Sequence, residues 1–263
     1  MLDKRTVENL AADLFRAERA GVAMTAASAL QPELDMDDAY AVQAALTALK
    51  IASGDTAAGY KIGLTSQPLQ IARGTNEPIY GRIMSSGVHS SGCDLPMASF
   101  IQPRIEVELA FVLKTPLVGP GRTLLDAVRA VEYVLPALEL VDTRVTAPDG
   151  ALRLEDFVCD NSFGAGAVIG SCPFTPDKAD LRWVSAICLR NGVIEDSGVA
   201  ASVLNHPAAG LAWLANRLAL DGESVPAGQV ILGGTFMAPL AVHKGDTIHA
   251  DYGPFGSVSC YFA

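Results

Sequence analysis

The sequence predicts an α+β fold in which a small helical N-terminal lobe lies on a larger mixed, mainly antiparallel β core. Helical periodicity dominates the first 56 residues, whereas short β-branched runs separated by Gly and Pro dominate from residue 57 onward. The regular alternation of strands and helices that is typical of nucleotide-binding folds is missing. We therefore expect a helical lobe at 1–56 and a β-rich domain at 57–263, which fits a chain of 263 residues.

Two helices form the predicted lobe. In the first, Val7, Leu10 and Leu14 recur at helical spacing, and Gly21 is placed to end it. The second begins after Asp35 and ends near Gly54. The lobe is thus predicted from apolar periodicity together with signals at the helix ends.

The β core is predicted from seven apolar runs, with two helices between them. The runs are 59–64, 104–113, 135–141, 167–170, 184–193, 229–232 and 247–263. One helix is capped by Thr123 and extends through TLLDAVRAVEYV, and the other begins near Pro207. Asn191-Gly192 and the segment 253–256 are hairpin signals.

Composition excludes several classes of protein. The chain has 19 basic and 29 acidic side chains, a net charge of −10, which disfavours nucleic acid and anionic membrane surfaces as partners. With 50% hydrophobic and 18% charged residues it is too apolar to be disordered. The first residues, MLDKRTV, contain no apolar signal core, so we expect a cytoplasmic protein without membrane spans. Five widely spaced cysteines without a CxxC pair are typical of reduced thiols.

A pair of carboxylates in the apolar run PRIEVELAFVL is the strongest sign of chemistry. Strand side chains alternate between faces, so Glu106 and Glu108 lie on one face. Glu139 lies in a similar run, VLPALELVD. An isolated ExE pair is usually a solvated strand face, but both runs look buried, and buried carboxylates need a cation or they protonate. Three such oxygen donors suit a hard divalent ion such as Mg²⁺.

Other candidate residues carry weaker signals. Lys61, in GYKIGLTS, is either a surface lysine or a pocket lysine that stabilises an enolate or moves a proton. Gly233-Gly234-Thr235 is either an ordinary turn or a loop whose N–H groups approach a ligand carboxylate. The four histidines are scattered, without a GxSxG motif, and no nucleotide-binding motif is present.

Several segments together resemble the 2-oxo-4-enoate hydratase and 4-oxalocrotonate decarboxylase family of the fumarylacetoacetate-hydrolase-like superfamily. They are KIGLTS, IQPRIEVELAFVLKTPLVGPG, VLPALELVDTR, the Asp160-Asn161 pair, LRWVSAICLRNGVIEDSGVAASVLNHPAAGLAWLANRLA, VILGGTF and HKGDTIHADYGPFGSVSC. The resemblance covers nearly the whole chain and implies the fold of that superfamily. QPRIEVELAFVL favours the hydratase branch, because the decarboxylase branch more often reads QPKAEGEIAFVL.

The resemblance implies a metal-dependent hydro-lyase of aromatic meta-cleavage catabolism. Its substrate would be a 2-hydroxy-2,4-dienoate in the 2-oxo-4-enoate form, above all the seven-carbon diacid. Glu106, Glu108 and Glu139 would bind Mg²⁺ or Mn²⁺. Lys61 would assist proton transfer or balance the charge of the enolate.

The resemblance also implies which residues bind substrate. Gly63 and Leu64 of KIGLTS, together with Gly234 and Thr235, match segments that approach the substrate. Arg104 or Arg153 would hold a distal carboxylate, a task that suits a planar guanidinium.

Three positions depart from the family pattern. Ile79 replaces an Asp in EPIYG, Tyr60 replaces a His before Lys61, and Phe157 replaces a Thr in DFVCDN. These changes leave the three glutamates intact and alter the expected proton route.

Alternative functions remain open at this point. Within the family they are a five- or six-carbon monoacid hydratase and 4-oxalocrotonate decarboxylase. Outside it they are an acylpyruvate-type C–C hydrolase, which needs a His base, and a non-catalytic assembly partner. We also expect a homo-oligomer built from dimers, because the chain has little polar surface, and an association with a pathway decarboxylase.

Overall fold

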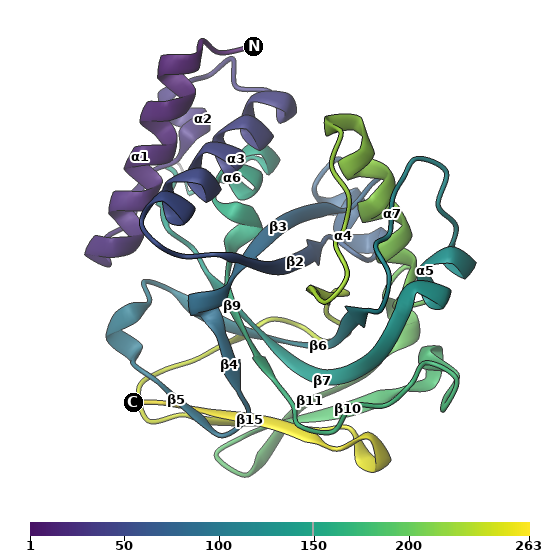
Figure 1. Ribbon diagram of the computed structural model, residues 1–263. Helices are drawn as coiled ribbons and strands as arrows, with labels where there is room; N and C mark the ends of the chain where they lie inside the picture. The colour runs from purple at the N-terminus through teal and green to yellow at the C-terminus, as the bar shows by residue number, and fades with distance from the viewer. Residues whose placement is uncertain (149) are drawn as a thin grey trace.

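The chain forms a group of helices at its N-terminal end and two β-sheets beneath them (Figure 1). A computed structural model describes residues 1–148 and 150–263. In the described residues, no helix has the length and apolar character needed to cross a membrane.

The lobe is built on two long helices, α1 (Lys4–Ala20) and α3 (Met36–Ala52). The carboxylate of Asp3 caps α1 and that of Asp35 caps α3, each by accepting a backbone N–H of the first turn. Gly21 ends α1 in the left-handed conformation, with φ of 65°. The sequence prediction of both helices is confirmed.

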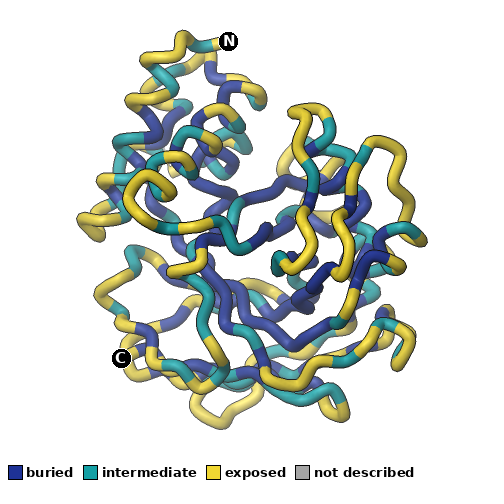
Figure 2. The backbone as a smooth tube through the Cα atoms, in the orientation of Figure 1, coloured by how far each residue is buried: buried dark blue, intermediate teal, exposed yellow. Residues whose placement is uncertain are grey.

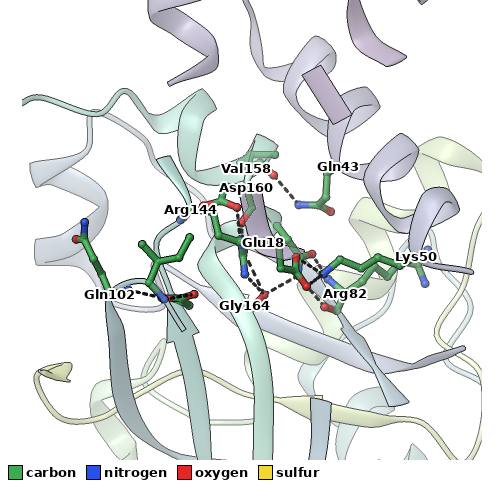
Figure 3. Close-up of polar contacts among 12 residues, drawn as sticks. Glu18, Gln43, Lys50, Arg82, Gln102, Arg144, Val158, Asp160 and Gly164 are labelled. Carbon is green, nitrogen blue, oxygen red and sulfur yellow. Dashed lines mark hydrogen bonds and ion pairs between the residues drawn. The ribbon is translucent and has the colours of Figure 1, made fainter. Parts of the chain in front are cut away.

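Two short helices complete this lobe, α2 (Ala27–Leu30) and α6 (Leu154–Cys159). The Gln43 side chain on α3 donates to the carbonyl of Tyr80 at 2.9 Å. It also donates to the carbonyl of Val158 at 3.0 Å (Figure 3). Because α6 comes from the second half of the chain, the apolar interior of the lobe draws on both sides of residue 56. The boundary between 1–56 and 57–263 stays a prediction.

The described strands form two larger sheets and one small pair. The larger sheet has the order β3-β2-β12-β6-β7-β9-β4, with β13 paired to β6, and the smaller has the order β11-β10-β14-β15-β5. The strands of the larger sheet are β2 (Ala57–Gly63), β3 (Ile79–Met84), β4 (Val88–Ser90), β6 (Pro103–Leu113), β7 (Val131–Asp142), β9 (Gly164–Ile169), β12 (Val230–Leu232) and β13 (Leu240–Ala241). Those of the smaller sheet and the pair are β5 (Cys93–Leu95), β10 (Ser185–Arg190), β11 (Val193–Val199), β14 (Thr247–Asp251), β15 (Ser257–Phe262), β1 (Met24–Thr25) and β8 (Val145–Thr146).

The sheets are mixed and mainly antiparallel, as predicted. The described strands pair in parallel at β1–β8, β2–β12, β4–β9 and β5–β15, and the other pairs are antiparallel. Asn191 and Gly192 both have positive φ in the turn between β10 and β11, which confirms that hairpin. β6 and β7 run through the buried centre of the molecule (Figure 2).

Three further helices pack around the core: α4 (Gln67–Ala72), α5 (Leu124–Ala130) and α7 (Ala209–Leu218). Thr123 caps α5 as predicted, but the helix ends at Ala130 and not within VEYV. From Val131 the chain pairs with β6, so strand pairing outweighs the helical periodicity there. Short 3₁₀ turns occur at 85–87, 97–99, 161–163, 181–183, 200–202, 219–221 and 253–255.

Ion pairs hold the lobe helices together and connect the end of α6 to the larger sheet (Figure 3). Lys50 on α3 pairs with Glu18 on α1 at 2.7 Å. The Arg144 guanidinium, only 1% exposed, pairs with Asp160, which also accepts the Arg144 backbone N–H at 2.8 Å. Asp160 therefore fixes the start of the turn that follows it, at 161–163.

Candidate active site

Three glutamates converge on one face of β6 and β7. Glu106 lies directly opposite Glu139 in the antiparallel register, and Glu108 lies two residues further along β6. One carboxylate oxygen from each of the three residues lies within 4.8 Å of the other two. The period-two alternation predicted for Glu106 and Glu108 is confirmed, because Ile105 and Val107 between and beside them are buried in the core.

The carboxylates have too few hydrogen-bond donors for three charged groups. Glu108 and Glu139 are fully buried, and Glu108 Oε2 accepts the backbone N–H of Gly234 at 2.8 Å. Glu108 Oε1 and Glu139 Oε2 have no hydrogen-bond partner among the described residues. Because buried carboxylates without partners are costly, a converging, all-oxygen set of this kind fits a hard divalent cation.

Lys61 on β2 is the cation that contacts this cluster. Its side chain is buried, and its Nζ lies 3.0 Å from Glu139 Oε1. The same ammonium group donates to the Ser162 carbonyl at 3.0 Å. The sequence left open whether Lys61 is a surface or a pocket residue, and the structure places it in the pocket.

Burial dominates the electrostatics of the cluster. It raises the pKa of Glu139 to about 7, although Lys61 opposes this. The pKa of Glu108 is raised well above its ordinary value by burial and by the neighbouring carboxylates, while Lys61 and Arg104 limit the rise for Glu106. Burial would lower the pKa of Lys61, but the glutamates, Glu139 foremost, raise it, so the ammonium stays charged.

A strained turn positions the acceptor for Lys61. Asn161, Ser162 and Phe163 have φ of 54°, 50° and 59°, a run of left-handed conformations that is costly without glycine. The Asn161 amide fixes the turn by donating to the carbonyls of Arg82 and Gly164, each at 2.9 Å. Sequence reasoning missed this turn, for which only the Asp160-Asn161 pair was a signal.

The loop at Gly234 is shaped by close approach to Thr65. Gly234 has φ of 115°, and a Cβ at this position would lie 2.2 Å from Thr65 Oγ1. Glycine therefore lets the backbone N–H reach Glu108. The hydroxyl of the next residue, Thr235, donates to the Met237 carbonyl at 2.9 Å.

A cavity of about 1220 Å³ opens in front of the cluster. The predicted site residues that line it are Lys61, Gly63, Leu64, Arg104, Glu106 and Thr235. Glu108, Glu139 and Gly234 lie behind this lining and contact the cluster as described above. A Cβ at Gly63 would lie 3.3 Å from Ile79 Cγ1 and in ordinary contact, 3.5 Å, with Lys61 Nζ, so Gly63 lies directly beside the ammonium.

Arg153 is the predicted site residue that the structure does not bring to the cavity. Its guanidinium donates to the carbonyls of Pro32 and Leu34, at 3.0 and 2.9 Å, and pairs with Glu155. Arg153 therefore ties the start of α6 to the lobe. Arg73, which sequence reasoning did not single out, lines the cavity in its place.

The three departures from the family pattern have distinct surroundings. Ile79 and Phe157 line the cavity and make part of its wall apolar. Tyr60 is outside that lining, and its hydroxyl accepts from the Arg82 guanidinium. Tyr60 is next to Lys61 on β2, so the two side chains lie on opposite faces of the strand.

Comparisons with known proteins agree with this geometry. The family model described as fumarylacetoacetate (FAA) hydrolase C-terminal matches residues 69–262. The chain is 49% identical to 2-oxo-hept-4-ene-1,7-dioate hydratase of Escherichia coli, with 100% of both chains covered. It is 34% identical to 2-hydroxyhexa-2,4-dienoate hydratase of Comamonas testosteroni, with 100% of this chain and 99% of that one covered.

A solved structure matches over the same length. It is 4-oxalocrotonate decarboxylase from Pseudomonas putida G7 complexed with magnesium and adipate, with a TM-score of 0.96 and 33% identity. The match covers 100% of this chain and 99% of that one.

Proposed function

The chain belongs to the fumarylacetoacetate hydrolase family, and we propose that within it the protein is a metal-dependent hydro-lyase of aromatic meta-cleavage catabolism. The substrate is 2-oxohept-4-ene-1,7-dioate, and addition of water at the fourth carbon gives 4-hydroxy-2-oxoheptanedioate. The observation that carries the proposal is the meeting of Glu106, Glu108 and Glu139 with Lys61 at a cavity. The full-length similarity to the E. coli hydratase supports the choice of reaction.

The three glutamates are the residues that would hold Mg²⁺ or Mn²⁺. The buried oxygens of Glu108 and Glu139 that lack hydrogen-bond partners fit a hard cation. The described cluster also contains no histidine or cysteine ligand, which agrees with such an ion. Such a cation, when bound, supplies Lewis acidity toward the 2-oxo and carboxylate oxygens of a substrate.

Lys61 acts as a charged hydrogen-bond donor. Its raised pKa keeps the ammonium protonated, so it balances negative charge that develops on the 2-oxo oxygen during tautomerisation. The Ser162 carbonyl and Glu139 hold the ammonium from two sides, which fixes its direction before substrate arrives. Lys61 is thus preorganised for the step in which a proton is added at the fifth carbon.

Hydrolysis of a C–C bond is disfavoured by the cavity lining. That chemistry needs a base that activates water, usually a histidine near a carboxylate. In the described part of the chain, none of the four histidines lines the cavity.

We also propose a homo-oligomer built from dimers, which associates with a pathway decarboxylase in the cytoplasm. Trp183, Val193 and Ile194, exposed by 72%, 67% and 60%, provide apolar surface for such contacts. The unpaired cysteines fit a reducing compartment. Light scattering tests the oligomer, and a monodisperse species of 27.5 kDa would contradict it. Sedimentation velocity of a mixture with the purified decarboxylase tests the association. The association predicts a complex that sediments faster than either protein alone.

The product of the reaction tests the proposed function. Purified protein is incubated with the seven-carbon dienol and Mg²⁺, and the product is identified by NMR. The proposal requires 4-hydroxy-2-oxoheptanedioate. Release of carbon dioxide without a hydrated product would support a decarboxylase instead, and turnover of five- or six-carbon monoacids alone would exclude the diacid substrate.

A further inference from the structure

Arg73 is a cation of the cavity without an acidic partner. It follows α4 directly and is exposed, and its guanidinium forms no ion pair or side-chain hydrogen bond with any described residue. Instead, the guanidinium carbon lies 4.4 Å from the centroid of the Phe157 ring on α6. A guanidinium stacked on a ring keeps the N–H groups at its edge available for a planar anion.

Arg73 and Glu106 of the glutamate cluster line the same cavity, Arg73 directly after α4 and Glu106 on β6. Phe157 in turn packs on Phe163, with ring centroids 4.4 Å apart. Phe163 follows Ser162, whose carbonyl binds Lys61. The path from the cluster to Arg73 therefore runs along aromatic side chains.

One wall of the cavity is apolar, although polar side chains also line the cavity. Leu64, Ile79, Phe157 and Phe163 line the cavity and pack in one apolar cluster. The cavity thus combines the charged groups around Glu106, this apolar wall and the Arg73 guanidinium stacked on it. At about 1220 Å³, it also exceeds the volume of roughly 300–1,000 Å³ of ordinary small-molecule sites.

We propose that Arg73, held flat on Phe157, binds the distal carboxylate of the substrate and determines the preference for a diacid over a monoacid. This assignment rests on the proposed function for the identity of the substrate. It gives Arg104 a different place, two residues from Glu106 on β6, where it offsets the charge of that carboxylate. Phe157 is a positioning residue, because it orients the guanidinium and carries no charge itself.

Binding measurements separate this proposal from the reaction. The probes are 2-oxoheptanedioate and 2-oxoheptanoate, saturated acids of equal length that cannot be hydrated, titrated by calorimetry in the presence of Mg²⁺. The parent protein should bind the diacid at least about tenfold more tightly, as expected for a charge-assisted hydrogen bond. Arg73→Met should remove this preference and leave the affinity for the monoacid unchanged.

Three further variants sharpen the test. Arg73→Lys should restore part of the preference, because it keeps the charge but loses the planar fork. Phe157→Leu should reduce the preference with the charge still present. Arg129→Met, a change at an exposed arginine on α5 outside the cavity, should behave like the parent.

The outcomes distinguish the two proposals. A diacid preference that persists in Arg73→Met, or that is missing from the parent, overturns the role of Arg73 even if the parent hydrates the diacid. A preference that depends on Arg73 in a protein that does not hydrate the dienol upholds the binding role and overturns the proposed reaction.

Discussion

Lys61 Nζ lies 3.0 Å from Glu139 Oε1, and both side chains are buried beside two further carboxylates. A single ammonium cannot neutralise three carboxylates, so the cluster retains an excess of negative charge when all of them are ionised. That excess is what a divalent cation would balance, and the position of Lys61 leaves it charged and facing the cavity.

Replacing Lys61 separates its catalytic role from metal binding. Lys61→Met should lower kcat by about 10²–10⁴-fold, because the positioned donor is lost. The affinity of this variant for Mg²⁺ at about pH 8, above the pKa of Glu139 of about 7, should be equal or higher, since a cation that repels the metal has been removed. Steady-state kinetics and calorimetric titration measure the two effects.

The matched control is Lys114→Met at an exposed lysine next to the end of β6. It should change neither quantity. A Lys61→Met protein that loses metal binding in proportion to activity would mean that Lys61 acts by maintaining the metal site.

The stability of the metal-free protein should depend on pH in a defined direction. The pKa of Glu139 is about 7 and that of Glu108 is raised well above its ordinary value, so the folded state binds more protons than the unfolded state between about pH 4.3 and these folded-state pKa values. Their contribution is complete below that pH and is lost as pH rises through the folded-state pKa values. The melting temperature without metal should therefore fall between about pH 6 and about pH 8.

Saturating Mg²⁺ should remove this trend, because metal and protons compete for the same oxygens. Metal affinity should accordingly decrease as pH is lowered from about 8 to about 6. Scanning calorimetry with and without Mg²⁺ measures both effects. A metal-free melting temperature that rises over this interval would show that the glutamates are not protonated in the folded state.

The backbone at Gly234 should tolerate no side chain. Gly234→Ala places a Cβ against Thr65 and strains a φ of 115°, so it should destabilise the fold by about 2 kcal/mol and weaken Mg²⁺ binding through Glu108. Gly228→Ala is the control, since it has φ of 79° but no atom within 4 Å of the new Cβ. It should cost about 1 kcal/mol and leave metal binding intact. Urea denaturation measures the free energy of unfolding of both variants, and titration measures their Mg²⁺ affinity. A Gly234→Ala protein that binds Mg²⁺ as tightly as the parent and Gly228→Ala would contradict this prediction.

Much of the site could be predicted from local patterns. Alternation along 103–113 places Glu106 and Glu108 on one face irrespective of the rest of the fold. The pairing of Glu106 with Glu139 depends on register between strands that are distant in sequence, so alternation alone could not establish it. The resemblance to a known family supplied that link.

The remaining differences come from tertiary contacts. Arg153 is near a family motif, which led to its prediction as a substrate-binding residue. In the structure its guanidinium instead donates to the carbonyls of Pro32 and Leu34 in the lobe. Arg73 follows a short helix that sequence reasoning did not predict, so its approach to Phe157 had no local signal. The helix after Thr123 ends early because the chain from Val131 onward forms a strand that pairs with β6.

The central claim is that three glutamates hold the cation on which hydration depends, and Glu108→Gln tests it most directly. The amide preserves the shape and can still accept the Gly234 N–H, but one charge is lost. The free energy of unfolding of the metal-free protein should rise by about 1 kcal/mol, because a buried carboxyl no longer has to be either protonated or ionised beside the other two. Glu132→Gln, at an exposed position on β7, is the control.

The decisive measurement is the rate of hydration of the seven-carbon dienol as a function of Mg²⁺ concentration, for the parent and both variants. The account predicts that the parent loses turnover after chelation and regains it with Mg²⁺, that Glu132→Gln behaves identically, and that Glu108→Gln stays inactive while unfolding cooperatively. Near-normal turnover of Glu108→Gln with Mg²⁺, or turnover by the parent that is unaffected by a chelator, would contradict it.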